Sequence, residues 1–333
     1  MAHGAKGVQV RRILVTGSSG FIGSQLVCRL RSRGDIVLGI GRRKLEDPEY
    51  LSHDLSTPIP DLGDGGFDVV IHAAARSNPW GSVQQFYRDN VTATQNVLDY
   101  CRRIGSPRLI FISSSSVYYR PQHQFNIVEE TPQAETPVNH YAWTKQLAEQ
   151  LVQTYAGPWT ILRPRAVYGP GDTVLLPRIL TAARAGRLPV LTVPNGPVIG
   201  DLIYIDNLLD AVESAANNEE ITGAFNLTNG EPVAILDFLF EVFDGLGIRR
   251  PTRRVSAGTA MAFAGCLELF HRIFRPSVEP SITRFGVHVF RYSKTFDISR
   301  ARSLLGSPRI DNAESLKRTV AWFREQLGQG IKE

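Results

Sequence analysis

The stretch RRILVTGSSGFIGSQLVCRLRSRGD, residues 11–35, decides the fold. Residues 13–15 form a short apolar run typical of a buried strand, and Leu26, Val27 and Leu30 recur at helical spacing. Between these two parts lie three glycines at the spacing G-x-x-G-x-x-G, which are Gly17, Gly20 and Gly23. The stretch therefore predicts a strand, a tight glycine turn and a helix, in that order.

A glycine turn between a strand and a helix predicts a dinucleotide-binding site. One glycine permits the turn, the next lets the backbone approach a pyrophosphate, and the third allows close packing of helix on strand. The start of the helix offers free N–H groups and a partial positive charge to the phosphates. The alternative is a turn without a ligand, and the spacing favours the cofactor. The predicted cofactor contacts in this turn are Gly17, Ser19, Gly20, Phe21, Ile22 and Gly23.

The second predicted strand, DIVLGIGRRK (residues 35–44), ends without an acidic residue. An Asp or Glu at this place would bind a ribose hydroxyl group and favour NAD. Here Gly41 takes the place, and Arg42 and Arg43 follow it. Two guanidinium groups suit a 2′-phosphate in charge and geometry, so we favour NADP(H) over NAD(H). A solvated basic loop is the alternative for this pair.

Strands and helices continue to alternate along the first half of the chain. FDVVIHAAA (residues 67–75) and RLIFISSSSVYY (residues 108–119) are apolar runs typical of buried parallel strands. Between them, Asn90 opens the helical pattern NVTATQNVLDYCRR. The alternation predicts an α/β fold, a doubly wound parallel Rossmann sheet with a smaller C-terminal substrate lobe.

Ligands of such sheets bind at the carboxyl ends of the strands, which places further candidate residues near the cofactor. We expect His53, Asp54 and Leu55 to close a third strand, with Asp54 meeting the adenine. Small side chains after the 67–75 strand would let the cofactor lie close, and they are Ala73, Ala74 and Ala75. We interpret His72 as a packed residue at the end of this strand rather than a base.

The sequence NHYAWTKQLAEQL (residues 139–151) carries Tyr141 and Lys145 four residues apart. In a helix they lie on the same face, one turn apart. A neighbouring ammonium group stabilises a phenolate and lowers a pKa that is ordinarily near ~10. The pair therefore predicts a tyrosine that exchanges protons in carbonyl–alcohol chemistry. Alone, the spacing also fits an ordinary amphipathic helix, and the glycine turn favours the catalytic interpretation.

Four motifs in this order, GSSGFIG, HAAA, SSSSVYY and YAWTK, resemble the extended short-chain dehydrogenase/reductase superfamily. The resemblance implies that Ser114 is the catalytic serine, with Ser115 as a possible stand-in. It implies that Tyr141 is the general acid/base, and that Lys145 binds the nicotinamide ribose and lowers the tyrosine pKa. It also implies cofactor roles for Asn90 and Pro164. A homodimer is implied as well, paired through the helices that carry Asn90 and Tyr141.

A second set of motifs resembles the 3β-hydroxysteroid dehydrogenase/isomerase-like branch, and the similarity extends from about Arg12 to Phe323. The motifs are LRPRAVYGPGDTVLLPRILTAARAGRLPVL, GDLIYIDNLLDAV, AFNLTNGEPV and TFDISRAR. Nucleotide-sugar enzymes of the superfamily typically carry an Arg just before the Ile-Tyr-Ile-Asp strand to bind phosphates. This chain has Gly200 and Asp201 there, which argues against a nucleotide-sugar substrate.

These observations predict an NADP(H)-preferring oxidoreductase that interconverts a secondary alcohol and a ketone. The expected substrate is apolar, a β-keto or β-hydroxy acid derivative or a sterol-like compound. One rival is a nucleotide-sugar epimerase or dehydratase, which would retain its NAD. The other is a non-catalytic NADP-sensing protein, and such proteins usually lack the Tyr or the Lys that this chain keeps.

Composition is ordinary for a globular protein of 333 residues, with 43% hydrophobic and 21% charged residues. The N-terminal MAHGAKGVQV is too polar for a signal peptide. Three cysteines are too widely spaced for a metal motif, and two fall on predicted helix core faces, so we expect a reducing cytoplasm and no metal. They are Cys28, Cys101 and Cys266. The basic residues are scattered, so we expect no nucleic-acid partner despite the net charge of +5.

We predict that residues 8–168 form the dinucleotide-binding core, joined by returning segments at about 198–228. Residues 169–197 and 229–333 would then form the substrate lobe. In the lobe, VSAGTAMAFAGCLELFHRIF predicts a helix with the apolar face Met261, Phe263, Ala264, Leu267, Phe270 and Phe274. We favour a packed lobe helix with a possible role as a lid, and consider membrane contact the less favoured alternative.

Overall fold

The computed structural model describes residues 10–63, 65–78, 80–194 and 196–328. Its centre is a seven-stranded sheet in the order β12-β7-β5-β4-β1-β2-β3, and each neighbouring pair is parallel. The strands are β1 (Arg12–Thr16), β2 (Ile36–Gly41), β3 (Tyr50–Ser52), β4 (Val69–His72), β5 (Arg108–Ile112), β7 (Trp159–Pro164) and β12 (Gly223–Leu227). This sheet confirms the predicted doubly wound α/β fold.

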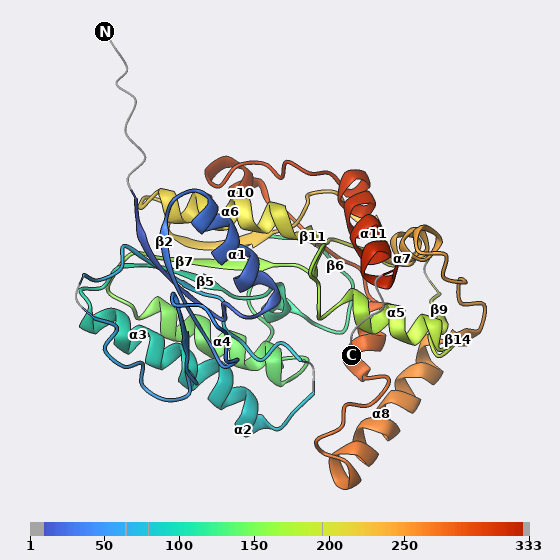
Figure 1. Ribbon diagram of the computed structural model, residues 1–333. Helices are drawn as coiled ribbons and strands as arrows, with labels where there is room; N and C mark the ends of the chain where they lie inside the picture. The colour runs from blue at the N-terminus through green and yellow to red at the C-terminus, as the bar shows by residue number, and fades with distance from the viewer. Residues whose placement is uncertain (1–9, 64, 79, 195, 329–333) are drawn as a thin grey trace.

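Helices cover both faces of the central sheet (Figure 1). One face carries α1 (Phe21–Ser32) and α6 (Ile205–Asn217), and the other carries α2 (Val83–Phe86), α3 (Ala93–Arg103) and α4 (His140–Gln153). Alternate residues of β1 belong to different cores, Ile13 and Val15 to one and Leu14 to the other. Since both faces are buried, the strands are continuously apolar, which explains why short apolar runs predicted them.

The point where the strand order changes direction lies at β1. This strand pairs with β2 on one side and with β4 on the other. The loops that leave the carboxyl ends of β1 and β4 therefore diverge, and a crevice opens between them. Gly17 follows β1 directly and Ala73 follows β4 directly, so the predicted cofactor residues lie at this crevice.

The remaining elements form the lobe and its connections to the core. A four-stranded sheet has the order β13-β10-β15-β6, and two small pairs are β11-β8 and β14-β9. The strands are β6 (Gln124–Ile127), β8 (Val167–Tyr168), β9 (Val190–Thr192), β10 (Ile199–Gly200), β11 (Ile203–Tyr204), β13 (Val233–Ala234), β14 (Arg254–Ser256) and β15 (Lys294–Phe296). The helices are α5 (Leu176–Arg184), α7 (Ile235–Gly245), α8 (Ala257–Phe274), α9 (Arg284–Val289), α10 (Ser299–Leu304) and α11 (Asn312–Gly328).

The predicted domain boundaries stay a prediction, and one strand pairing crosses them. β6 lies within the predicted core but pairs with β15 of the predicted lobe. Residues 8–9 of the predicted core and 329–333 of the predicted lobe lie outside the described residues, as does most of the N-terminal segment considered as a signal peptide.

Three predicted element boundaries were wrong. β3 ends at Ser52, just before His53, and β4 ends at His72, so the alanines follow the strand. Asn90 does not open a helix but lies inside one, in a π-helical segment η1 (Tyr87–Thr92) between α2 and α3. The helix begins earlier because Ser82 caps it, in a reciprocal capping box with Gln85.

Two expectations about buried faces were also wrong. Cys101 is buried, whereas Cys28 and Cys266 are exposed. α8 packs through its small and polar positions, and its buried residues are Ala257, Ala260, Ala264, Glu268 and His271. Phe263, Phe270 and Phe274 of the predicted core face are exposed instead. Figure 1 shows why, because α8 extends away from the central sheet and has few elements beside it. Within the described residues, no helix has the length and apolarity needed to cross a membrane.

Candidate active site

The glycine turn is packed so closely that two of its glycines admit no side chain. Gly17 has φ 70°, and a Cβ atom on it would lie 2.7 Å from the Cα atom of Ala74. A Cβ atom on Gly23 would overlap the carbonyl group of Gly17. Gly20 precedes α1, and no side chain caps the start of this helix. The turn thus combines a close backbone approach with free helix N–H groups, which fits a bound pyrophosphate.

A pocket opens beside this turn, at the carboxyl ends of β1, β2 and β4. Six predicted cofactor residues line it together, which are Gly17, Arg42, Asp54, Leu55, Ala74 and Ala75. Five further lining residues were not predicted, which are Gly41, His53, Arg76, Asp89 and Ala93. Residues from five separate segments of the chain therefore meet at one site, as a dinucleotide site requires.

The other predicted cofactor residues surround this pocket. Arg43 donates from Nη1 to the carbonyl oxygen of Ser19 at 3.3 Å, which ties the loop after β2 to the glycine turn. Phe21 and Ile22 are half-buried in the first turn of α1. The backbone N–H of Ala73 donates to the carbonyl oxygen of Thr16, at the end of β1, at 3.3 Å.

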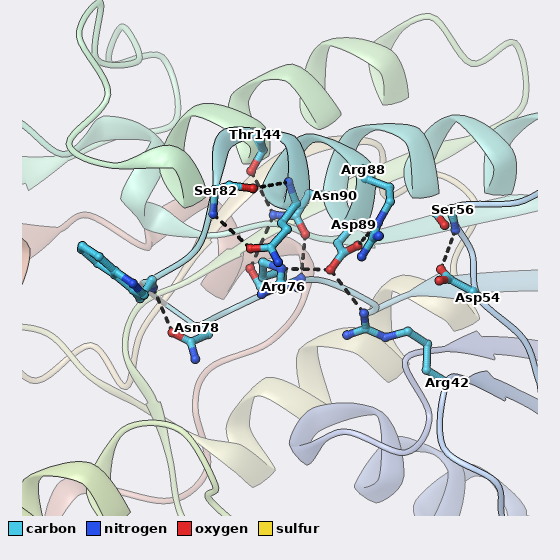
Figure 2. A network of polar contacts seen from close by, with 12 residues as sticks. Arg42, Asp54, Ser56, Arg76, Asn78, Ser82, Arg88, Asp89, Asn90 and Thr144 are labelled. Carbon is cyan, nitrogen blue, oxygen red and sulfur yellow. Dashed lines mark hydrogen bonds and ion pairs between the residues drawn. The ribbon is translucent and has the colours of Figure 1, made fainter. Parts of the chain in front are cut away.

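Three guanidinium groups converge on one buried carboxylate at the rim of the pocket (Figure 2). Asp89 accepts from Arg42 Nη1 at 3.2 Å, from Arg76 Nε at 2.9 Å and from Arg88 Nε at 2.8 Å. Its side chain is only 5% exposed. Three positive charges against one negative charge leave a positive excess, and this excess suits a phosphate group.

Asn90 uses its amide group inside the protein. Its Oδ1 accepts from the backbone N–H of Arg76 at 2.7 Å, and its Nδ2 donates to Thr144 Oγ1 at 2.9 Å (Figure 2). The residue therefore joins the loop after β4 to α4, which carries Tyr141. The π-helical segment η1 directs this side chain inward, and such segments are frequent at functional sites.

Ser114, Tyr141 and Lys145 meet at the carboxyl end of β5. The Ser114 hydroxyl accepts from the backbone N–H of Ser116 at 3.2 Å and caps the short 3₁₀ helix η2 (Ser115–Tyr118). The helix α4 begins after Asn139, whose side chain accepts from the backbone N–H of Ala142 at 2.8 Å. Ser115 is buried within η2, so Ser114 is the serine that lies at the phenol.

Burial dominates the acid–base properties of Tyr141 and Lys145. Burial raises the pKa of Tyr141, and the nearby hydroxyl of Ser114 partly offsets this rise. The Nζ atom of Lys145 donates to the carbonyl oxygen of Ile112 at 2.8 Å and lies 4.6 Å from the centre of the Phe111 ring. Burial lowers the pKa of Lys145 itself to about 7. That Lys145 lowers the pKa of the phenol when the cofactor is bound stays a prediction.

A buried ion pair that the sequence did not predict holds α4 against the sheet. Arg163 on β7 donates from Nη2 to Glu149 Oε2 of α4 at 2.7 Å, and the side chains are 5% and 1% exposed. Glu149 also accepts from Ser113 and Gln133, and Arg163 donates to the hydroxyl of Tyr118. Glu149 lies two turns after Tyr141, so this network fixes the helix that presents the phenol.

The model of the NAD dependent epimerase/dehydratase family matches residues 13–228. The chain belongs to this family. A 2-alkyl-3-oxoalkanoate reductase of Stenotrophomonas maltophilia is 33% identical, over 93% of this chain and 98% of that protein. The human sterol-4-alpha-carboxylate 3-dehydrogenase, decarboxylating, is 29% identical, over 95% of this chain and 89% of that protein. A UDP-glucuronic acid 4-epimerase of Bacillus cereus in complex with NAD shares the fold, with a TM-score of 0.71, 23% identity, and coverage of 94% and 99%.

Three further residues singled out in the sequence, His72, Pro164 and Asp201, have clear positions in this epimerase/dehydratase-family protein. His72 is 1% exposed and hydrogen-bonded to Thr16 and Thr94, and burial lowers its pKa to about 3, so it is the packed residue that we expected. Pro164 ends β7, next to β5. Asp201 is buried, and its Oδ2 accepts from the backbone N–H of Phe296 at 2.8 Å.

Proposed function

We propose that this protein is an NADP(H)-preferring oxidoreductase that interconverts a ketone and a secondary alcohol. The observation that carries the proposal is the meeting of Ser114, Tyr141 and Lys145 at the end of β5, beside the crevice that holds the glycine turn. The named relatives support a reductase or dehydrogenase, since that is what the printed names describe.

An apolar β-oxo or β-hydroxy acid is the proposed substrate class, with a sterol-like compound as the second possibility. The names of the two relatives describe an oxoalkanoate and a sterol carboxylate. Asp201 supports this choice over a nucleotide sugar, because it stands at the position where sugar-active relatives carry an arginine that binds phosphate, and this chain lacks that contact.

The three side chains have separate tasks in the proposed mechanism, and that of Lys145 would be to bind the ribose of the nicotinamide. When bound, the reduced nicotinamide supplies the hydride that the ketone carbon accepts. The hydroxyl groups of Ser114 and Tyr141 donate hydrogen bonds to the ketone oxygen and stabilise its developing negative charge. Tyr141 then gives its proton to that oxygen. Burial raises the pKa of Tyr141, so the phenol carries the proton that this step requires.

The proposed preference for NADP(H) rests on the guanidinium groups around the pocket. Arg42 lines the pocket, and Arg76 and Arg88 share the carboxylate of Asp89 with it. A 2′-phosphate would balance the excess positive charge, whereas the 2′-hydroxyl group of NAD would not. The glycine turn would hold the pyrophosphate of either cofactor.

Replacement of Tyr141 by phenylalanine tests the proposal. Tyr141→Phe should lower the rate of ketone reduction by about 10³-fold or more, since both proton donor and hydrogen bond are lost. The Kd for NADPH should change by less than about 2-fold, because the phenol does not hold the pyrophosphate. Turnover equal to that of the unsubstituted protein would remove Tyr141 from the mechanism.

Assembly and location remain predictions. A homodimer would pair through α3 and α4, and Val83 and Tyr87 of the preceding segment are exposed next to these helices. A cytoplasmic location fits the three unpaired cysteines.

A further inference from the structure

A buried guanidinium group without a partner lies close to the proposed active site. Arg165 follows β7 directly and is 9% exposed, and its Nε atom is fully buried. Its backbone N–H donates to the carbonyl oxygen of Leu227, but its side chain makes no hydrogen bond to any residue that the structure describes. A buried guanidinium group without a hydrogen-bond partner is unfavourable, so such a group indicates a ligand that completes it.

Two other buried hydroxyl groups without partners belong to the segment that follows β5. The Tyr119 hydroxyl and the Ser116 hydroxyl are buried and have no hydrogen-bond partner within the described parts of the chain. Arg165 lies within electrostatic range of both Tyr119 and Asp201. Lys294 completes the group, with its Nζ atom 4.4 Å from the centre of the Tyr119 ring.

The charge balance of this group favours an anion. Arg165 and Lys294 contribute two positive charges, and Asp201 contributes the only carboxylate among these five residues. Burial raises the pKa of Asp201 to about 6 and lowers the pKa of Lys294 to about 7, so Asp201 is mostly charged and Lys294 partly charged at neutral pH, and Arg165 leaves a positive excess. The ammonium of Lys294 already donates to the carbonyl oxygens of Arg120 and Gln122. The guanidinium of Arg165 is therefore the group with hydrogen-bond donors left for a ligand, and a carboxylate can accept from it in a bidentate manner.

Chain connections place this group beside the reacting carbonyl. Leu162 of β7 pairs with Ile112 of β5, and the backbone N–H of Ser113 donates to the carbonyl oxygen of Leu162 at 2.7 Å. Ser114 and Arg165 therefore leave neighbouring strands at the same edge of the sheet. Ser116 and Tyr119 belong to the segment that follows Ser114.

We infer that Arg165, together with Tyr119, forms a carboxylate-binding subsite next to Ser114 and Tyr141. This inference rests on the proposed function and narrows it, because it selects free β-oxo and β-hydroxy acids over their esters. The carboxylate lies two bonds from the reacting carbon in such acids, so one substrate molecule reaches both groups.

The test compares an acid with its methyl ester in the oxidation direction. A 2-alkyl-3-hydroxyalkanoic acid is the probe, because it does not lose CO₂ as the oxo acid does. The unsubstituted protein should prefer the acid in kcat/KM by about 100-fold or more. Arg165→Met should lose that preference, with ester turnover unchanged within about 3-fold. Arg184→Met, at an exposed position on α5, is the matched control and should keep the preference.

Several results would overturn the subsite. One is equal use of acid and ester by the unsubstituted protein, and another is an equal loss of both substrates in Arg165→Met. Binding of the hydroxy acid, measured by calorimetry, separates this inference from the proposed function. Binding that is lost in Arg165→Met, without turnover in either protein, would support the subsite and refute the proposed reaction. If Arg165→Met does not fold, the preference for the acid over the ester is measured in Arg165→Lys and in the unsubstituted protein instead.

A second, independent observation concerns the exposed face of α8 and the turn after it. Fifteen large apolar side chains are exposed in the described chain, and six lie within residues 263–278. They are Phe263, Leu269, Phe270, Ile273, Phe274 and Val278, with exposed fractions from 47% to 68%. Single exposed apolar residues are common, but a cluster of this kind marks an interaction surface.

The charges of this segment identify the partner. Arg272 and Arg275 are exposed among the apolar residues. The two acidic residues are already paired, Glu268 with Arg284 and Glu279 with Arg178. A surface with aromatic side chains and free positive charges is complementary to an anionic lipid surface. We propose that the apolar cluster and these two arginines dock on anionic bilayers.

The end of this segment also touches the side of the protein that carries the active site. Trp80 Nε1 donates to the carbonyl oxygen of Pro276 at 2.9 Å, and Arg272 lies within electrostatic range of His140, the neighbour of Tyr141. Docking would therefore bring an apolar substrate in the bilayer close to the active site.

Vesicle flotation tests the docking surface. The unsubstituted protein should float with vesicles of phosphatidylglycerol and phosphatidylcholine, and less with phosphatidylcholine alone. Phe270→Ser with Phe274→Ser should reduce the floated fraction by at least about 5-fold, with turnover of a water-soluble substrate unchanged. The control is Phe125→Ser, which removes an equally exposed phenylalanine elsewhere. Equal flotation of the double variant and the unsubstituted protein would overturn the proposal. A dimeric unsubstituted protein that becomes monomeric in the double variant would also overturn it, since a second copy would then cover the face.

Discussion

The contribution of Arg42 to cofactor choice can be worked out from its contacts. Its guanidinium lines the pocket and lies 3.2 Å from Asp89, and its side chain is 57% exposed. A charged hydrogen bond to a phosphate contributes about 1.5–3 kcal/mol. Solvent screening and competition from Asp89 reduce this to about 1–2 kcal/mol for Arg42. Arg42→Ala should therefore raise the Kd for NADPH by about 5- to 30-fold.

Fluorescence titration of NADPH and NADH at physiological ionic strength measures this effect. The Kd for NADH should change by less than about 2-fold, because NADH carries no 2′-phosphate for Arg42 to bind. Lys44→Ala is the matched control, since Lys44 is a nearby exposed cation that does not line the pocket. Equal losses for both cofactors in Arg42→Ala would refute the assignment of this arginine to the 2′-phosphate.

Two further variants test the helix that presents Tyr141. Glu149→Gln removes the negative charge that pairs with the buried Arg163. The free energy of unfolding, measured in urea, should therefore fall by about 3 kcal/mol. A fall below about 1 kcal/mol would contradict the role of this ion pair. Lys145→Met should abolish turnover. The pKa of Lys145 is lowered from 10.5 to about 7 in the folded protein. The charge of Lys145 therefore destabilises the folded protein fully below pH 7, and this effect disappears as the pH rises from 7 to the unfolded-state pKa. The melting temperature of Lys145→Met relative to the unsubstituted protein should thus be higher at pH 6 than at pH 9, and the opposite order in scanning calorimetry would contradict this.

Features that depend on short spacings could be predicted from the sequence. The glycine turn is local, because Gly17 and Gly23 meet within one turn of chain. Tyr141 and Lys145 share a helix face for the same reason. Ser82 and Gln85 form a capping box, and this signal in the sequence would have placed the start of the helix that contains Asn90.

Features that depend on contacts between distant segments could not be predicted. Asp89 meets Arg42 across 47 positions of sequence, and no local pattern encodes this pairing. Periodicity also shows which face of a helix is apolar, but not whether a neighbouring element covers it. The apolar positions of α8 therefore suggested a core, whereas the fold leaves Phe270 and Phe274 exposed.

The fate of free NADPH during turnover tests the central claim most directly. We predict that incubation with a 2-alkyl-3-oxoalkanoate consumes one NADPH for each hydroxy acid formed. The loss of nicotinamide absorbance measures the NADPH consumed, and chromatography measures the hydroxy acid formed. Conversion of a UDP-sugar to its epimer with no change in added NADPH, and no reaction with the oxo acid, would contradict it.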